Sequence, residues 1–167
     1  MQDINTVVTF SSRTGETERL ALAAALGAVQ ARSLIRLRWL REDVDDAMIG
    51  SVPEWRENRA RMAKEYIAPR EIDFLWADVL VLGLPARDGV SSPELKTYLD
   101  ALMPLQAGGK LHGKVGTAFS AGGDGALVSL CSVFEGLDLI LVPPDLTASA
   151  LLHGRKVTEA ARELKRG

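Results

Sequence analysis

The chain of 167 residues is 47% hydrophobic and 25% charged, which is ordinary for a globular protein and sufficient to bury a core. Its formal net charge of −2 excludes a global field that would recruit nucleic acid or an anionic membrane. The amino terminus lacks the features of a signal peptide, and charged residues interrupt each apolar stretch before it reaches membrane-spanning length. With a lone cysteine, Cys131, these features predict a soluble, cytoplasmic protein without an internal disulfide or membrane span.

Apolar runs alternate with helical patterns along the chain. Strands are predicted, in chain order, at residues 5–11, 32–38, 78–84, 114–121 and 138–143. Helices are predicted at residues 16–30, 93–103, 125–136 and 155–166. The run 78–84 is almost continuously apolar, as expected for a parallel strand that is covered on both faces.

Strand and helix repeat with short connections, an order that predicts an α/β fold with a doubly wound parallel sheet and helices on both faces. The irregular part is the charge-rich segment 41–70, where Trp55, Met62 and Tyr66 have spacings that suit one face of a helix. We expect residues 1–167 to form a single domain in which 41–70 is an insertion. Its expected role is to pack an apolar stripe on the domain, not to form a separate site.

The junction of the first strand and first helix, SSRTGET at residues 11–17, crowds hydroxyl groups around one glycine. In an open parallel sheet, ligands bind where strand carboxyl ends meet helix amino termini, and the free N–H groups there suit a phosphate. Gly15 allows close approach of the backbone to such a ligand. Side-chain donors in the same loop are Ser12, Arg13, Thr14 and Thr17. The alternative is a plain helix start with Thr14 as its capping residue.

The junction is neither a Walker A loop nor a G-x-G-x-x-G dinucleotide loop, and no acidic pair follows the first strand as in receiver domains. It resembles the phosphate loop of flavodoxins, [ST]-x-T-G-x-T, which residues 12–17 fill. Residues 76–102 contain Gly83-Leu84-Pro85 at a strand end and then L-K-x-x-L-D. They resemble the flavin loop and following helix of WrbA-type NAD(P)H:quinone oxidoreductases and related FMN reductases. Residues 111–126 resemble the fourth strand and second flavin loop of that group, and the closing helix is similar too.

The resemblance implies a flavodoxin-like, five-stranded sheet of order 2-1-3-4-5 and an FMN-dependent oxidoreductase. Hydride would pass from NAD(P)H through FMN to a quinone or similar small molecule, with no catalytic side chain. The residues implied to hold the FMN phosphate are Ser12, Arg13, Thr14, Gly15, Glu16 and Thr17. Those implied to border the isoalloxazine ring are Pro85, Ala86, Arg87, Asp88, Gly89 and Val90 on one side, and Ser120, Ala121, Gly122, Gly123, Asp124 and Gly125 on the other. Relatives self-associate over the flavin, which implies a homodimer or homotetramer.

Two features depart from the family pattern. Relatives commonly present an aromatic residue to the flavin from the first flavin loop, whereas residues 85–92 contain none. Arg87 could stack its guanidinium there or neutralise the N1–O2 edge of reduced flavin, and Trp55 or Tyr66 could restore stacking from the insertion or a neighbouring subunit. Glu16 stands where relatives usually have Asn, and it suits a helix amino terminus on its own account.

Two other functions are weighed against the reductase. Ser120 lies in a sequence similar to the G-x-S-x-G nucleophile elbow of hydrolases, and Asp145 and His153 follow in triad order, but the leading glycine is missing. The second alternative function is a flavodoxin-like binding or electron-transfer module that binds FMN weakly or has lost it. Electron-carrier proteins tend to have a more negative net charge than the −2 of this chain.

Smaller features receive structural interpretations. Exposed positions are expected for His112 and His153, and a position in a helix core for Cys131. The mixed charges of residues 54–65 are expected to form a salt-bridged, solvent-exposed face and not an RNA-binding patch.

Overall fold

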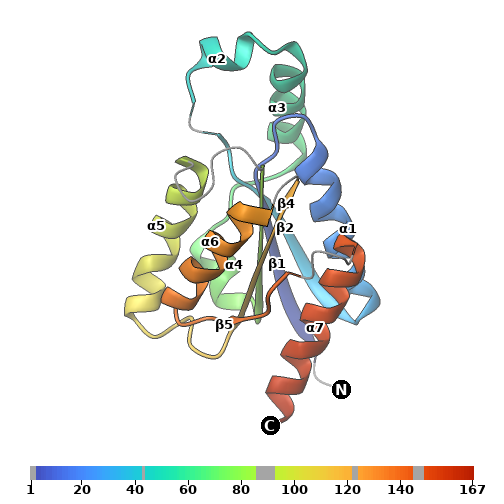
Figure 1. The fold of residues 1–167 in the computed structure, drawn as a ribbon, viewed down its shortest axis with the longest axis vertical. Coiled ribbons are helices and arrows are strands. Elements are labelled where there is room, and N and C mark those ends of the chain that lie inside the picture. The colour runs from blue at the N-terminus through green and yellow to red at the C-terminus, as the bar shows by residue number, and fades with distance from the viewer. Residues whose placement is uncertain (1–2, 43, 86–92, 122–123, 145–148) are drawn as a thin grey trace.

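A computed structural model describes residues 3–42, 44–85, 93–121, 124–144 and 149–167. In this part of the chain, five parallel strands form a sheet of order β2-β1-β3-β4-β5. The strands are β1 (Ile4–Phe10), β2 (Ser33–Trp39), β3 (Val79–Pro85), β4 (Val115–Ala121) and β5 (Ile140–Leu141). Helices α1 (Glu16–Gln30) and α7 (Ala150–Arg166) cover one face, and α4 (Glu71–Trp76), α5 (Pro93–Ala107) and α6 (Asp124–Gly136) cover the other (Figure 1). The predicted fold class and strand order are confirmed.

The sheet has a hydrophobic core on each face because successive side chains of a strand point in opposite directions. In β3, Leu80 and Leu82 pack with residues of α5 and α6, whereas Val79 and Val81 pack with residues of α1 and α7. All four side chains are 2% exposed or less. This double burial is the physical reason that the β3 sequence is apolar without alternation.

Two glycines allow α1 and α7 to lie in backbone contact. A Cβ atom on Gly27 of α1 would overlap the carbonyl oxygen of Leu151 in α7. A Cβ atom on Gly154 of α7 would likewise overlap the carbonyl oxygen of Ala24 in α1. Each glycine therefore serves the close approach of the two helices, and this approach holds the body of α1 against the sheet.

We expect Gly154→Ala to lower the free energy of unfolding by about 2–3 kcal/mol, because a backbone carbonyl cannot move aside as a flexible side chain can. Urea denaturation followed by circular dichroism measures the change. The control is Gly50→Ala in α2 (Asp46–Gly50), where nothing lies within 4 Å of the added Cβ. Equal stabilities of the Gly154→Ala variant and the unaltered chain would contradict the close-packing interpretation.

The segment 41–70 contains α2 and α3 (Pro53–Glu65), which lie beyond the carboxyl ends of the strands (Figure 1). The predicted one-sided helix is confirmed in α3, where Trp55 is 4% and Met62 0% exposed. Helix α4 follows this segment and was not predicted from the sequence. It is a single short helix whose Phe74 and Asp73 are completely buried, so its formation depends on tertiary contacts.

Two boundaries near the carboxyl end differ from the prediction. Strand β5 pairs with β4 only at Ile140 and Leu141, whereas a strand over 138–143 was expected. Helix α7 begins at Ala150, five residues earlier than expected. Its capping residue is Ser149, whose side-chain oxygen accepts a hydrogen bond from the N–H of Leu152 (3.3 Å).

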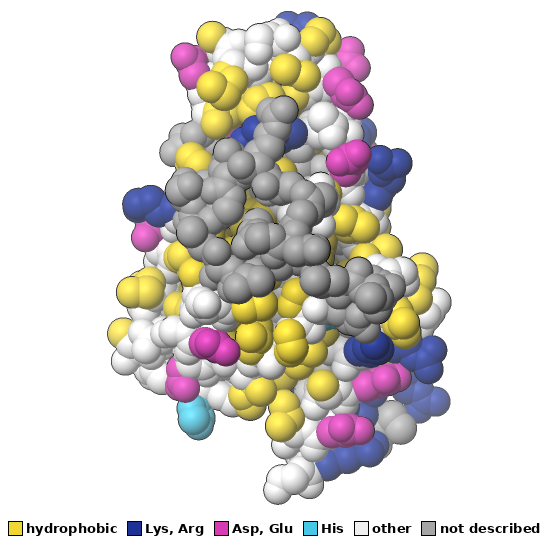
Figure 2. All heavy atoms as spheres, viewed as in Figure 1, with side chains coloured by type: hydrophobic (Ala, Val, Ile, Leu, Met, Phe, Trp, Pro, Cys, Tyr) yellow, Lys and Arg dark blue, Asp and Glu magenta, His cyan; other side chains and the backbone are white. Residues whose placement is uncertain are grey.

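Acidic and basic side chains lie among one another on the face shown in Figure 2, including the surface over α7 at the lower right. On α7, Arg155 Nε and Glu159 Oε1 form an ion pair at 3.1 Å, one turn apart. None of the helices within the described ranges is both long and apolar enough to cross a membrane.

Candidate functional site

The loop between β1 and α1 has the conformation expected of a phosphate-binding turn. Gly15 precedes the first residue of α1 and has φ +96°, a left-handed conformation that glycine adopts without strain. Ser12 Oγ accepts a hydrogen bond from the Gly15 N–H (3.1 Å) and so closes the turn. The alternative with Thr14 as the helix cap is wrong, because Gly15 is the capping residue and α1 has no side-chain cap among the described residues. The first-turn N–H groups of α1 are therefore available to an anion.

The pairing of the strands brings this loop beside the ends of β3 and β4. Phe10 at the end of β1 is the register partner of Gly83, and the Ser11 N–H donates to the Gly83 carbonyl oxygen (3.0 Å). Pro85, the last residue of β3, is the partner of Ala121, the last residue of β4. Sequence positions more than 100 residues apart thus meet at one edge of the sheet.

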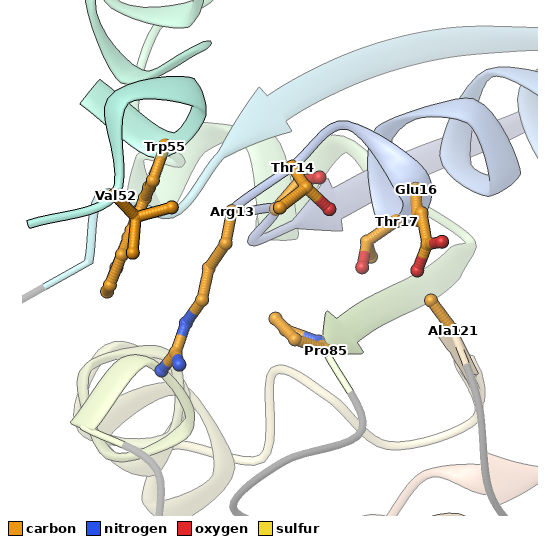
Figure 3. Close-up of a pocket in the computed structure, with 9 residues that line it drawn as sticks. Arg13, Thr14, Glu16, Thr17, Val52, Trp55, Pro85 and Ala121 are labelled. Carbon is orange, nitrogen blue, oxygen red and sulfur yellow. The ribbon is translucent and has the colours of Figure 1, made fainter. Parts of the chain in front are cut away.

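A cavity of about 440 Å³ lies at this edge (Figure 3). Its lining residues are Ser12, Arg13, Thr14, Glu16, Thr17, Val52, Trp55, Pro85 and Ala121. Seven of these belong to the predicted set, and the volume lies in the range of small-molecule and cofactor sites. In Figure 3, Glu16 and Thr17 point from α1 towards the side where Pro85 and Ala121 lie. The structure therefore brings predicted residues from three distant segments of the chain to one cavity.

The remaining predicted ring-bordering residues lie outside the cavity lining or outside the described residues. Ser120 precedes Ala121 on β4, and its Oγ is buried with no hydrogen-bond partner among the described residues. Asp124 and Gly125 open α6. The predicted ring-bordering residues that lie outside the described residues are Ala86, Arg87, Asp88, Gly89, Val90, Gly122 and Gly123.

One wall of the cavity comes from α3 and the residue preceding it; Trp55 was weighed from the sequence as a stacking residue, whereas Val52 was not assigned to the site. Val52 and Trp55 line the cavity, and Trp55 lies beneath the Arg13 guanidinium, with Cζ 4.7 Å from the ring centroid. The expectation that segment 41–70 only packs on the domain was incomplete. The signal in the sequence was an aromatic residue isolated in a highly charged segment.

Helix α3 is attached to α1 by a buried carboxylate. Glu18, 5% exposed, accepts hydrogen bonds from Arg61 Nη1 (3.0 Å) and from the Tyr66 hydroxyl (2.8 Å). The hydrogen bonds from Arg61 hold the pKa of Glu18 below its usual range and outweigh the opposing effect of burial. Tyr66 also packs edge-on against Phe10, with ring centroids 5.0 Å apart. These contacts fix the Trp55 wall relative to the phosphate loop.

A second buried carboxylate, Glu42, lies close behind this wall. It is 1% exposed, and neither carboxylate oxygen has a hydrogen-bond partner among the described residues. Burial raises the pKa of Glu42 and outweighs the opposing effects of its own backbone, of the nearby Trp55 indole and of Arg59. Because the folded state then binds a proton more tightly than the unfolded state, the stability of the fold decreases as pH rises through this pKa.

We expect Glu42→Gln to increase the free energy of unfolding at pH 8 by about 1 kcal/mol, because the cost of burying an unpaired charge disappears. Near pH 4, where the carboxyl is already protonated, the gain should vanish. Urea denaturation at the two pH values measures both. The control is Glu57→Gln, an exposed position on α3. A gain of the same size at both pH values would contradict this interpretation of Glu42.

The hydrolase alternative is not supported by the described side chains. His153 was expected to be exposed, but it is 5% exposed and its Nε2 lies 2.8 Å from Thr117 Oγ1. Ser120 Oγ has no hydrogen-bond partner among the described residues, and Asp145 lies outside them. The buried histidine contacts Thr117 of β4 and so supports the packing of α7 on the sheet.

Three smaller expectations can also be compared with the structure. The His112 side chain is 78% exposed, as predicted. Cys131 is half-buried on α6, and burial raises the pKa of its thiol. Arg61 pairs with Glu65 one turn later on α3 (2.7 Å), as expected of a salt-bridged face. No group of three or more metal-ligating side chains is found within the described ranges.

The sequences of several quinone reductases are similar to this chain. A protein of Archaeoglobus fulgidus named NAD(P)H dehydrogenase (quinone) is 27% identical over 94% of this chain and 87% of its own length. NAD(P)H dehydrogenase (quinone) 3 of Rhizobium meliloti is 32% identical over 70% of this chain. The match spans only 52% of the Rhizobium protein's length.

Solved structures support the fold. A flavodoxin, WrbA-like protein from Agrobacterium tumefaciens superimposes with a TM-score of 0.62 at 21% identity, covering 96% of this chain and 98% of that protein. A flavodoxin of Streptococcus pneumoniae gives 0.60 at 19% identity, covering 95% and 98%. The sequence model of the NADPH-dependent FMN reductase family matches residues 7–151, which include the phosphate loop, Pro85 and Ala121. These matches confirm the predicted resemblance, the oxidoreductase class and the FMN and NAD(P)H cofactors, and they disfavour the alternative of a binding module. The chain belongs to the NADPH-dependent FMN reductase family.

Proposed function

We propose that this chain binds FMN in the cavity at the carboxyl ends of β1, β3 and β4 and transfers hydride from NAD(P)H to a quinone-like acceptor. One observation carries this proposal: the amino terminus of α1, which has no side-chain cap among the described residues, and the ends of the paired strands β3 and β4 line the same cavity. The names of the relatives, NAD(P)H dehydrogenase (quinone), support the choice of acceptor.

The residues of the cavity fit the two chemical ends of FMN. First-turn N–H groups of α1 and the hydroxyls of Thr14 and Thr17 provide hydrogen bonds for the phosphate. Pro85 and Ala121 provide apolar contacts at the strand ends, where the ring system would lie. Ser12 closes the turn by accepting from the Gly15 N–H and so positions the phosphate-binding groups.

When bound, FMN would supply the redox chemistry, namely hydride transfer between a nicotinamide and the acceptor. The chain binds and orients the flavin through the Ser12–Thr17 loop and the two flavin loops that begin at Pro85 and Ser120. The residues proposed to contact FMN in these three loops are those that the family resemblance implies. No side chain is required to act as acid or base.

The proposed setting follows the family resemblance. Residues 1–167 are proposed to form a single flavodoxin-like domain with segment 41–70 as an insertion. The proposed assembly is a homodimer or homotetramer in the cytoplasm.

Two measurements test the proposed function. The first follows the quenching of flavin fluorescence while cofactor-stripped protein is titrated with FMN, and saturable binding at micromolar concentrations is the expected result. The second follows oxidation of NADH and NADPH at 340 nm with benzoquinone, and turnover that depends on FMN is expected. No binding at high micromolar FMN would overturn the proposal.

A further inference from the structure

A second cavity, of about 380 Å³, lies between the end of β2 and the helices α2 and α3, which stand beyond the carboxyl ends of the strands (Figure 1). Three arginines, Arg41, Arg56 and Arg59, line it together with one carboxylate, Asp46. The other lining residues are Trp39, Ile49, Ala60 and Ala63. The excess of positive charge suits an anionic ligand.

The guanidinium groups of the second cavity are available to such a ligand. Arg41 and Arg56 are exposed, and within the described part of the chain neither side chain forms a hydrogen bond or an ion pair. Arg59 is more fixed, since its side chain is 13% exposed and its Nη1 lies 3.5 Å from Asp46 Oδ1. The Asp46 side chain is 95% exposed, so water can replace Arg59 as its partner when a ligand binds. Guanidinium groups bind phosphate through paired, parallel hydrogen bonds, and the second cavity can therefore hold a phosphate.

The remaining surface of the second cavity is apolar and aromatic. Ile49 is 3% and Trp39 5% exposed, and Ala60 and Ala63 of α3 complete this surface. The Trp39 Nε1–H is buried and has no hydrogen-bond partner among the described residues, so an acceptor atom of a ligand would satisfy it. An adenosine phosphate combines a planar base, several acceptor atoms and a phosphate, and it matches all three kinds of group in this cavity.

Helix α3 contributes to both cavities. Val52 and Trp55 at its amino-terminal end line the cavity proposed to bind FMN, and the next turns, as far as Ala63, line the second cavity. At 1.5 Å per residue, Val52 and Ala63 are about 17 Å apart along the helix axis. A nicotinamide dinucleotide carries adenosine at one end of a pyrophosphate and nicotinamide at the other, so its two ends can occupy neighbouring cavities.

We propose that the second cavity binds the adenosine 2′-phosphate end of NADPH and thereby makes this chain prefer NADPH to NADH. This inference rests on the proposed function. Arg41, Arg56 and Arg59 would pair with the 2′-phosphate, and Trp39 would donate its Nε1–H to the adenosine. NADH carries a hydroxyl group in place of this phosphate, so it gains nothing from the three charges.

Steady-state kinetics with the two nucleotides test this assignment. We expect Arg56→Gln to raise the KM for NADPH by about tenfold and to leave the KM for NADH, the kcat values and the Kd of FMN unchanged. The same result is expected of Arg41→Gln. The matched control is Lys64→Gln, which removes a positive charge from an exposed position of α3 outside the cavity lining. Its KM for NADPH should stay within twofold of that of the unaltered chain.

Adenosine 2′,5′-bisphosphate gives a second readout that does not depend on turnover, because it has the 2′-phosphate but no nicotinamide. Titration calorimetry should show saturable binding to the unaltered chain and binding about tenfold weaker to Arg56→Gln. Adenosine 5′-monophosphate, which lacks the 2′-phosphate, should bind more weakly than the bisphosphate and equally to the unaltered chain and the variant.

Three outcomes would overturn the inference while leaving the proposed function in place. The first is an unaltered chain that uses NADH as well as NADPH. The second is an equal rise of the two KM values in Arg56→Gln and Arg41→Gln, which would assign these arginines to a part that both nucleotides share. The third is an absence of bisphosphate binding to the unaltered chain. Failure to bind FMN would instead overturn the proposed function, and the bisphosphate titration would still test the second cavity on its own.

Discussion

Replacing Thr14 and Thr17 together by alanine is expected to weaken FMN binding by about 100-fold. Each hydroxyl is proposed to donate to the phosphate, and the loss of one hydrogen bond to a charged group costs about 1.5 kcal/mol, or roughly tenfold in affinity. Thr17 is 2% exposed, whereas Thr14 is exposed, and both side chains line the cavity. Titration of cofactor-stripped protein, followed by flavin fluorescence, measures the effect.

The control for this double variant is Thr97→Ala, which removes an exposed hydroxyl of α5 from outside the cavity. Its FMN affinity should equal that of the unaltered chain. Riboflavin affinity should not change in the double variant, because riboflavin lacks the phosphate. FMN binding of full strength in the double variant would place the phosphate elsewhere and contradict the proposed site.

Asp73→Asn is expected to lower the free energy of unfolding by about 3–5 kcal/mol, the cost of removing one partner from a buried ion pair. Asp73 is 0% exposed and accepts from Arg38 Nε (2.8 Å), Arg36 Nη1 (3.1 Å) and the Arg70 N–H (2.9 Å). The asparagine would leave two arginines without a carboxylate between β2 and α4. Urea denaturation at pH 7 measures the loss.

The pH dependence provides a further check on Asp73. Burial opposes ionisation, but the hydrogen bonds from Arg38, Arg70 and Arg36 outweigh it and lower the pKa of Asp73. The folded state therefore binds this proton less tightly than the unfolded state, and the stabilisation is present at neutral pH and lost as pH falls below the carboxyl's ordinary range. The exposed control Asp100→Asn, which interrupts a surface pair with Lys96, should change stability by less than about 0.5 kcal/mol. A similarly small effect of Asp73→Asn would contradict the assigned role.

The amino-acid sequence by itself determined the order of the five strands and of the longer helices, because the signals are local. The apolar run of β3 and the alanine-rich pattern of α1 are readable in short windows, and α1 was predicted at its observed bounds, Glu16–Gln30. The hydroxyl-rich loop at residues 12–17 was also recognisable, because its turn requires a glycine and its short polar residues are consecutive in the sequence. The strand order follows from the resemblance, and the structure confirms it.

Only the tertiary structure decided the features that depend on contacts between distant segments. Glycine has a low helix propensity, yet Gly154 lies inside α7. A Cβ atom at this position would overlap the backbone of Ala24, so glycine is required for the contact between α7 and α1. The sequence left open whether Trp55 of α3 or Tyr66 would reach the site, since the position of α3 depends on the ion pair of Arg61 with Glu18 in α1. Helix α4 escaped prediction because its stability comes from the burial of Asp73 and its partners on β2. Periodicity reports the local conformation of a chain, whereas these arrangements depend on which surfaces meet after folding.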